Sequence, residues 1–175
     1  MPKRPVLIPT LKLDEIAAYH RDILGALRLF FSPSNPRFEE LFVGKTHDDV
    51  DREFQTRKEE SEFRSSFVVL TSLEASFQVD FGFRCGQKLK DDLSRHFRKL
   101  EKERGTKVPL DDILEGWKAY GGVPPAEIGE VRGAFKFRHW FAHGRFSEWK
   151  FGRKRDFFTV RLMADRITSV FPFQA

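Results

Sequence analysis

The sequence predicts an all-α protein, and three observations support that fold class. Apolar residues, above all the 20 phenylalanines, recur at steps of three and four, which is the spacing of one face of an α-helix. Clusters of proline, glycine and asparagine separate these stretches and mark helix ends. No stretch shows the sustained apolar–polar alternation that a half-buried β-strand requires. We therefore expect an up-and-down bundle of four main helices with short additional helices.

The first helix is predicted over residues 13–31 and ends at the proline-rich stretch 32–36, with a short helix near 37–43. A long helical pattern begins at Thr46. One stripe of that pattern, at steps of three and four, consists of Phe63, Phe67, Leu70, Glu74, Phe77 and Phe81.

Gly82 and Gly86 are expected to end or bend the long helix, because glycine is a poor helix former. A highly charged amphipathic helix is predicted over residues 89–103. A short helix then starts at Pro109 and ends near residues 120–122.

Pro124 and Pro125 open the helix that ends in a cluster of arginine and histidine. Proline suits the first turn because its missing N–H would have no partner there, and Gly144 stands where a C-terminal cap is expected. A last helix is predicted over residues 155–169. One broad face of the helix after Pro125, expected to pack inward or against a partner, holds Ile128, Val131, Phe135, Arg138, His139 and Ala142.

The length of 175 residues suits a single domain that buries a core without disulfides or metal, so we expect one domain over residues 1–175. Cys85 is the only cysteine, so no internal disulfide can form. Residues 1–12 contain several prolines and are expected to be extended. No stretch approaches the roughly 20 apolar residues of a membrane span, and we expect a cytoplasmic protein without a membrane partner.

Basic residues outnumber acidic ones by 31 to 26, a formal net charge of +5, which favours an anionic partner. The stretch 131–156 is the most basic part of the chain, and it interleaves basic with aromatic side chains. That pattern suits a nucleic-acid strand whose bases stack nearby, although a buried aromatic face with a solvated basic edge is the simpler interpretation. The residues expected to position RNA are Arg132, Arg145, Lys150, Arg153, Lys154 and Arg155.

Arg138, His139 and His143 form the cluster with the clearest chemistry. Arginine binds phosphate oxygens bidentately and stays charged, and histidine exchanges protons near neutral pH. On an ideal helix Arg138 and His143 lie roughly 140° apart, and Ala142 between them leaves room for a phosphate. Metal-free RNA cleavage needs a base for the 2′-hydroxyl proton, an acid for the 5′-oxygen and a cation for the charge on phosphorus.

The stretch 138–143, Arg-His-Trp-Phe-Ala-His, resembles the signature of the HEPN ribonucleases. That signature is an arginine, a polar residue, three to five further residues and a histidine. The resemblance implies a HEPN-like helical bundle and a metal-independent endoribonuclease, without a cofactor, that acts as a toxin or in antiphage defence. Arg138 and His143 would carry catalysis, assisted by His139. The resemblance also implies a homodimer with a composite active site, and an antitoxin or sensor protein as a further partner.

Glu74 interrupts an otherwise apolar stripe, where an unpaired charge would be costly. It either forms a structural ion pair with a buried arginine or orients Arg138 or His139 from the neighbouring helix. Some HEPN families carry an acidic residue on the corresponding helix.

Several alternatives stay open. Arg132 and His139 give a second register of the motif, with Gly133 at the polar position, and Gly129 lies four residues before Gly133, which would allow a second helix to approach. His139 and His143 have the spacing of a helical metal pair, but no further ligands stand at recognisable positions, so no metal is expected. The main alternative function is a non-catalytic helical module that binds nucleic acid or a partner protein. A helix-turn-helix DNA binder ranks third, because no short recognition helix stands out.

Overall fold

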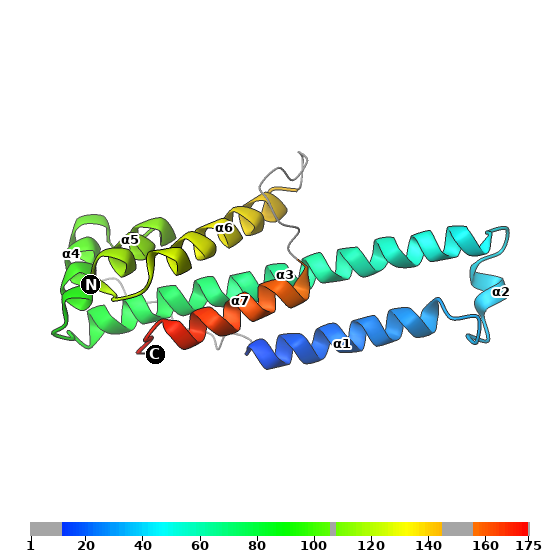
Figure 1. Cartoon of the computed structure of the whole chain (residues 1–175), viewed down its shortest axis with the longest axis horizontal. Coiled ribbons are helices and arrows are strands. Elements are labelled where there is room, and N and C mark those ends of the chain that lie inside the picture. The colour runs from blue at the N-terminus through cyan, green and yellow to red at the C-terminus, as the bar shows by residue number, and fades with distance from the viewer. Residues whose placement is uncertain (1–11, 106–107, 145–155, 175) are drawn as a thin grey trace.

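The computed structural model describes residues 12–105, 108–144 and 156–174, and these residues form seven helices and no strand (Figure 1). The predicted all-α fold class is confirmed. All of the expected extended segment except Lys12 lies outside the described residues. The helices are α1 (Leu13–Phe30), α2 (Phe38–Leu41), α3 (His47–Gly86), α4 (Asp92–Arg104), α5 (Leu110–Tyr120), α6 (Pro125–Ala142) and α7 (Phe157–Val170).

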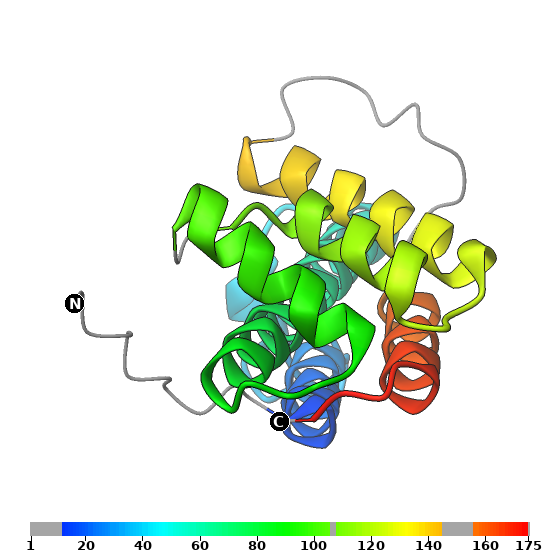
Figure 2. The same ribbon diagram turned by 90° about the vertical axis from the view of Figure 1, so that its left-hand side faces the viewer.

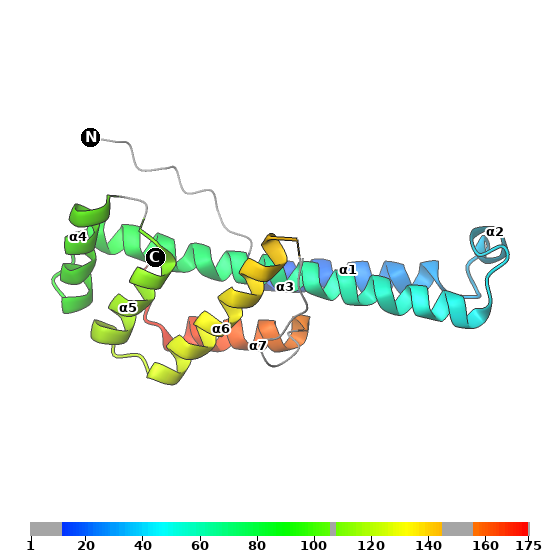
Figure 3. The same cartoon turned by 90° about the horizontal axis from the view of Figure 1, so that it is seen from above.

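Helix α3 is 40 residues long and organises the molecule. α1 packs along its N-terminal half and α7 along its C-terminal half, so that these two helices follow one another (Figures 1 and 3). Arg161 of α7 joins their ends, because it donates hydrogen bonds to the carbonyl of Leu13 and to the carboxylate of Asp14. The four longest helices therefore do not run side by side over their full length, and the HEPN-specific form of the bundle stays a prediction.

The main core lies where α4 to α7 pack around the C-terminal half of α3, and α6 and α7 occupy different sides of α3 (Figure 2). Its largest side chains, Phe77, Phe97, Trp117 and Phe137, come from four different helices and are fully buried. Burying one such side chain contributes roughly 1.5–3 kcal/mol, so α6 is held firmly through Phe137. A second, smaller core near α2 contains Phe31, Phe42 and Val50.

Local hydrogen bonds explain where helices begin. The Thr46 hydroxyl accepts the N–H of Asp49 at 3.2 Å, and the Asp49 carboxylate accepts the N–H of Thr46 at 3.0 Å, which forms a capping box at the start of α3. The hydrogen bonds from Thr46 hold the pKa of Asp49 at about 2. α4 begins at Asp92 and not near residue 89 as expected, because Asp91 accepts the N–H of Ser94 and acts as its N-cap.

The long helix was expected to end or bend in the region of Gly82 and Gly86, and α3 ends at Gly86, although it continues through Gly82. A glycine inside a helix costs about 1 kcal/mol relative to alanine, which is too little to end a helix that is otherwise well packed. Phe77, Phe81 and Cys85 are buried on either side of Gly82 and keep α3 continuous.

The buried face of α6 agrees only in part with the predicted face. Its buried residues are Ile128, Val131, Ala134 and Phe137, whereas His139 and Ala142, which were expected to pack inward or against a partner, are exposed. Phe137 occupies the core position because its ring packs against a phenylalanine of α3. As a result, the histidines at the end of α6 face solvent.

Candidate functional site

The C-terminal end of α6 and the residue that follows it, His143, present Arg138, His139 and His143 at the edge of the core. Arg138 is half-buried and both histidines are exposed. The two imidazole rings lie side by side, with 4.1 Å between their centroids. The N–H of His143 donates to the carbonyl of His139, and Gly144 has a positive φ of 81° that suits a helix end. The expected cap at Gly144 is confirmed, and both histidine side chains are accessible to a ligand.

Arg138 is held from α3. Its Nη2 lies 2.9 Å from Oε2 of Glu74, and the two side chains are 31% and 26% exposed. Its guanidinium also lies over the ring of Phe67, 5.7 Å from the centroid. Its Nε is buried and has no hydrogen-bond partner among the described residues. Arg138 is therefore the partner of Glu74, and its guanidinium is oriented without being fully satisfied.

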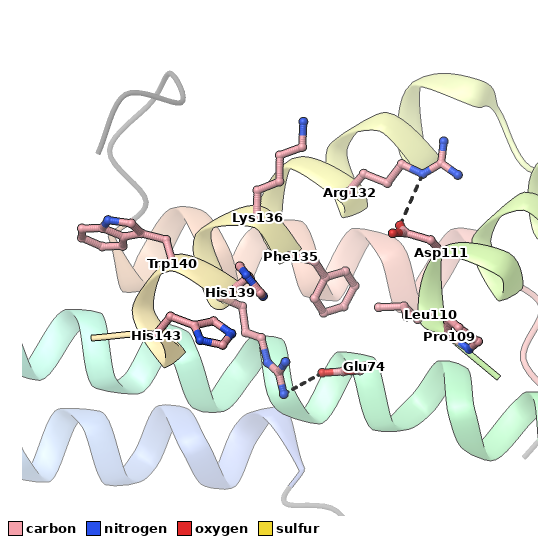
Figure 4. A pocket seen from close by; sticks show the side chains of 11 residues that line it. Glu74, Pro109, Leu110, Asp111, Arg132, Phe135, Lys136, His139, Trp140 and His143 are labelled. Carbon is pink, nitrogen blue, oxygen red and sulfur yellow. Dashed lines mark ion pairs between the residues drawn. The ribbon is translucent and has the colours of Figure 1, made fainter. Parts of the chain in front are cut away.

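These side chains line one pocket, with a volume of ≈ 820 Å³, built from α6, α3 and the start of α5. In Figure 4, His143 lies toward one end, Phe135 lies in the middle, and Leu110 and Asp111 lie toward the other end. A pocket of this size suits a ligand such as a nucleotide. Its lining residues are Glu74, Pro109, Leu110, Asp111, Arg132, Phe135, Lys136, Arg138, His139, Trp140 and His143.

Arg132 connects the far end of the pocket to α5. It forms an ion pair with Glu115, and its Nε lies 4.0 Å from Oδ1 of Asp111. The hydrogen bond from Arg132 lowers the pKa of Glu115 below its usual value. The positive charge of Arg132 is thus partly neutralised by the carboxylates of α5. Arg132 is therefore less free to bind a phosphate than expected from the sequence.

The pocket brings together every predicted site residue that the structure describes, namely Glu74, Arg132, Arg138, His139 and His143. The remaining basic residues that were expected to position RNA lie outside the described residues, and they are Arg145, Lys150, Arg153, Lys154 and Arg155.

Sequence reasoning missed Leu110 and Asp111 as pocket residues. They belong to the first turn of α5, and no motif links that turn to the end of α6. Lys136 belongs to the basic stretch of the sequence. It stands three residues before His139, and this spacing could have predicted that the two side chains lie on one side of a helix.

Within residues 12–105, 108–144 and 156–174, no three histidine, cysteine, aspartate or glutamate side chains are grouped so that they could hold a metal ion. None of the helices in these ranges is both long and apolar enough to cross a membrane.

No family model, no curated protein and no solved structure matches this chain. The resemblance of residues 138–143 to the HEPN signature therefore stays a prediction. A function for this chain has to follow from the chemistry of the pocket.

Proposed function

We propose that this chain is a metal-independent endoribonuclease of the HEPN type that acts as a toxin or defence effector. The observation that carries this proposal is that Arg138, His139 and His143 share one solvent-open pocket. Their side chains supply a cation for the charge that develops on phosphorus and groups that exchange protons near neutral pH.

In the proposed reaction the ribose 2′-oxygen attacks the adjacent phosphorus, and the bond from phosphorus to the 5′-oxygen breaks. A base takes the 2′-hydroxyl proton and an acid protonates the 5′-oxygen, so the products carry a 2′,3′-cyclic phosphate and a 5′-hydroxyl. His143 takes part in these proton transfers. Arg138 neutralises the charge on the non-bridging oxygens, and His139 binds the phosphate or orients Arg138.

The surroundings of Arg138 support its role. Glu74 and Phe67 already hold the guanidinium on one side, so binding a phosphate costs little side-chain entropy. In this proposal Glu74 is a positioning residue, because it acts through Arg138.

We further propose that two copies of the chain pair through α6 and complete one another's active sites. Gly129 supports this pairing, since it is exposed and a Cβ atom built on it would meet nothing within 4 Å. A second helix can approach closely at such a position. An antitoxin or sensor protein would restrain the activity in the cell.

The test is cleavage of total RNA by purified protein in EDTA, with wild type beside His143→Ala. We expect wild type to cut and to leave cyclic phosphate ends, and the variant to lose on the order of 10²–10⁴-fold in rate. His47→Ala is the matched control, because His47 is an exposed histidine at the start of α3, far from the pocket (Figure 1).

Equal cutting by wild type and His143→Ala would remove this histidine from the mechanism. If neither protein cuts while both are folded and bind RNA, the non-catalytic helical module that binds nucleic acid or a partner protein becomes the better interpretation.

A further inference from the structure

The pocket extends well beyond the groups that the proposed reaction uses. Its other half has an apolar wall of Leu110 and Phe135, which are half-buried against the main core, and the Asp111 carboxylate at its rim (Figure 4). Cleavage of a phosphodiester requires none of these three side chains. This half of the pocket would therefore bind a part of the ligand other than the reacting phosphate.

Asp111 is the informative residue, because a carboxylate repels phosphate and binds hydrogen-bond donors. Its side chain is 86% exposed, and its ion pair with Arg132 is 4.0 Å long, which is too long for a hydrogen bond and leaves both carboxylate oxygens able to accept one. The dipole of α5 favours acidic residues in its first turn, where Asp111 and Asp112 stand. Asp112 pairs with Arg104, whereas Asp111 lines the pocket.

Two neighbouring carboxylate oxygens match two neighbouring N–H donors. Among the RNA bases only guanine offers such a pair, the N1–H and the 2-amino group on its Watson–Crick edge. Adenine and cytosine place an acceptor nitrogen beside their amino group, and uracil flanks its single N–H with two carbonyl oxygens. In either arrangement a bidentate approach sets a lone pair against one carboxylate oxygen, so these bases can give the carboxylate only a single hydrogen bond.

The spacing within the pocket suits a base beside the reacting phosphate. Phe135 and His139 are four residues apart on α6, which corresponds to about 6 Å along the helix axis and is similar to one nucleotide step. Stacking of a base on an aromatic side chain strengthens binding by about tenfold or more. Lys136 lies between these two residues in sequence, is exposed and lines the same pocket, where it suits a flanking phosphate.

We infer that the half of the pocket formed by Leu110, Asp111 and Phe135 is a guanine subsite. The base stacks against Phe135 and Leu110, and the Asp111 carboxylate accepts its N1–H and 2-amino hydrogens. This inference rests on the proposed endoribonuclease function and deepens it, because it makes cleavage specific for phosphates next to guanosine.

The test uses RNA oligonucleotides that differ at one nucleoside, which is guanosine, inosine or adenosine. Inosine keeps the N1–H and lacks the 2-amino group. We expect wild type to cut beside guanosine on the order of tenfold faster than beside inosine, and Asp111→Asn to lose most of this preference. Glu115→Gln is the control variant, and we expect it to keep the preference for guanosine. Glu115 contacts the same Arg132 but does not line the pocket.

Cleavage without a guanosine preference, or with the same preference in Asp111→Asn, would overturn the subsite and leave the endoribonuclease proposal standing. If wild type cuts no RNA, the endoribonuclease proposal fails, and the subsite is then tested by titrating guanosine and inosine 5′-monophosphates into folded protein. Tighter binding of the guanosine nucleotide that Asp111→Asn abolishes would support the subsite. Equal affinity for both nucleotides would overturn it.

Discussion

At the scale of single residues, the contact between Glu74 and Arg138 links two helices at the pocket. It joins α3 to the C-terminal end of α6, and both side chains are partly exposed. An ion pair of this partial exposure contributes little to stability, about 0–1 kcal/mol. The main effect of this ion pair would then be to fix the direction of the Arg138 guanidinium.

Glu74→Gln is therefore expected to lower kcat by about tenfold or more, with little change in KM and with melting temperature close to that of wild type. Steady-state cleavage kinetics measure kcat and KM, and thermal unfolding of the same preparations measures the melting temperature. Glu60→Gln is a suitable control, because it removes another carboxylate that pairs with an arginine on α3, but outside the pocket. Unfolding of Glu74→Gln would instead assign Glu74 a structural role.

Much of the site could be predicted at this scale because its chemistry is local. Arg138, His139 and His143 stand within six consecutive residues, and helical spacing alone brings them to one end of one helix. Asp111 could not be found in this way. It reaches the pocket only because α5 packs against α6, which is a tertiary contact without a sequence pattern.

At the scale of elements, turn chemistry and periodicity predicted the seven helices to within a few residues. They did not predict which side of α6 faces inward, since Phe135 and Phe137 are equally apolar and point to different sides. Phe63 of α3 decides between them, because its ring lies 5.9 Å from that of Phe137. The rotation of a helix about its axis is thus set by its neighbours and not by its own pattern.

The junction of α1, α3 and α7 is held by His20. This histidine is 5% exposed, its Nδ1 lies 2.9 Å from Oγ of Ser65, and its ring stacks on Phe157 at 3.9 Å. Burial lowers the pKa of His20 below its ordinary value of 6.5. As pH falls below 6.5, the unfolded chain binds a proton at this position before the folded chain does, so the folded state loses stability.

We expect the free energy of unfolding of wild type to decrease between pH 7.5 and pH 5.5, with His20 contributing at most about 1.4 kcal/mol per pH unit. His20→Asn removes the contribution of His20. The free energy of unfolding of this variant should therefore change less with pH than that of wild type, even if the variant is less stable at both pH values. Urea unfolding at the two pH values measures the slopes, and His47→Asn, at an exposed position, should keep the slope of wild type. Parallel slopes for wild type and His20→Asn would contradict the expectation.

At the scale of the whole molecule, the placement of α1 and α7 one after the other along α3 lengthens the bundle (Figure 3). Periodicity could not predict this arrangement, because each helix has one apolar face that could equally pack at another position along α3. In this arrangement α6 contacts α3, α5 and α7, and the pocket opens between α6, α3 and the start of α5. A second chain could therefore meet this pocket without rearrangement of the fold.

The last prediction concerns whether one chain or two chains make the active site. Arg138→Ala and His143→Ala are each expected to abolish cutting, and a mixture of the two, unfolded and refolded together, is expected to regain part of it. Activity returns because a mixed dimer keeps one intact arginine and one intact histidine from different chains. Light scattering of the same samples should give a mass near twice the 20.5 kDa of one chain. A mixture that stays inactive, with wild type active as a monomer, would place all catalytic groups in one chain, where Arg138, His139 and His143 already share a pocket.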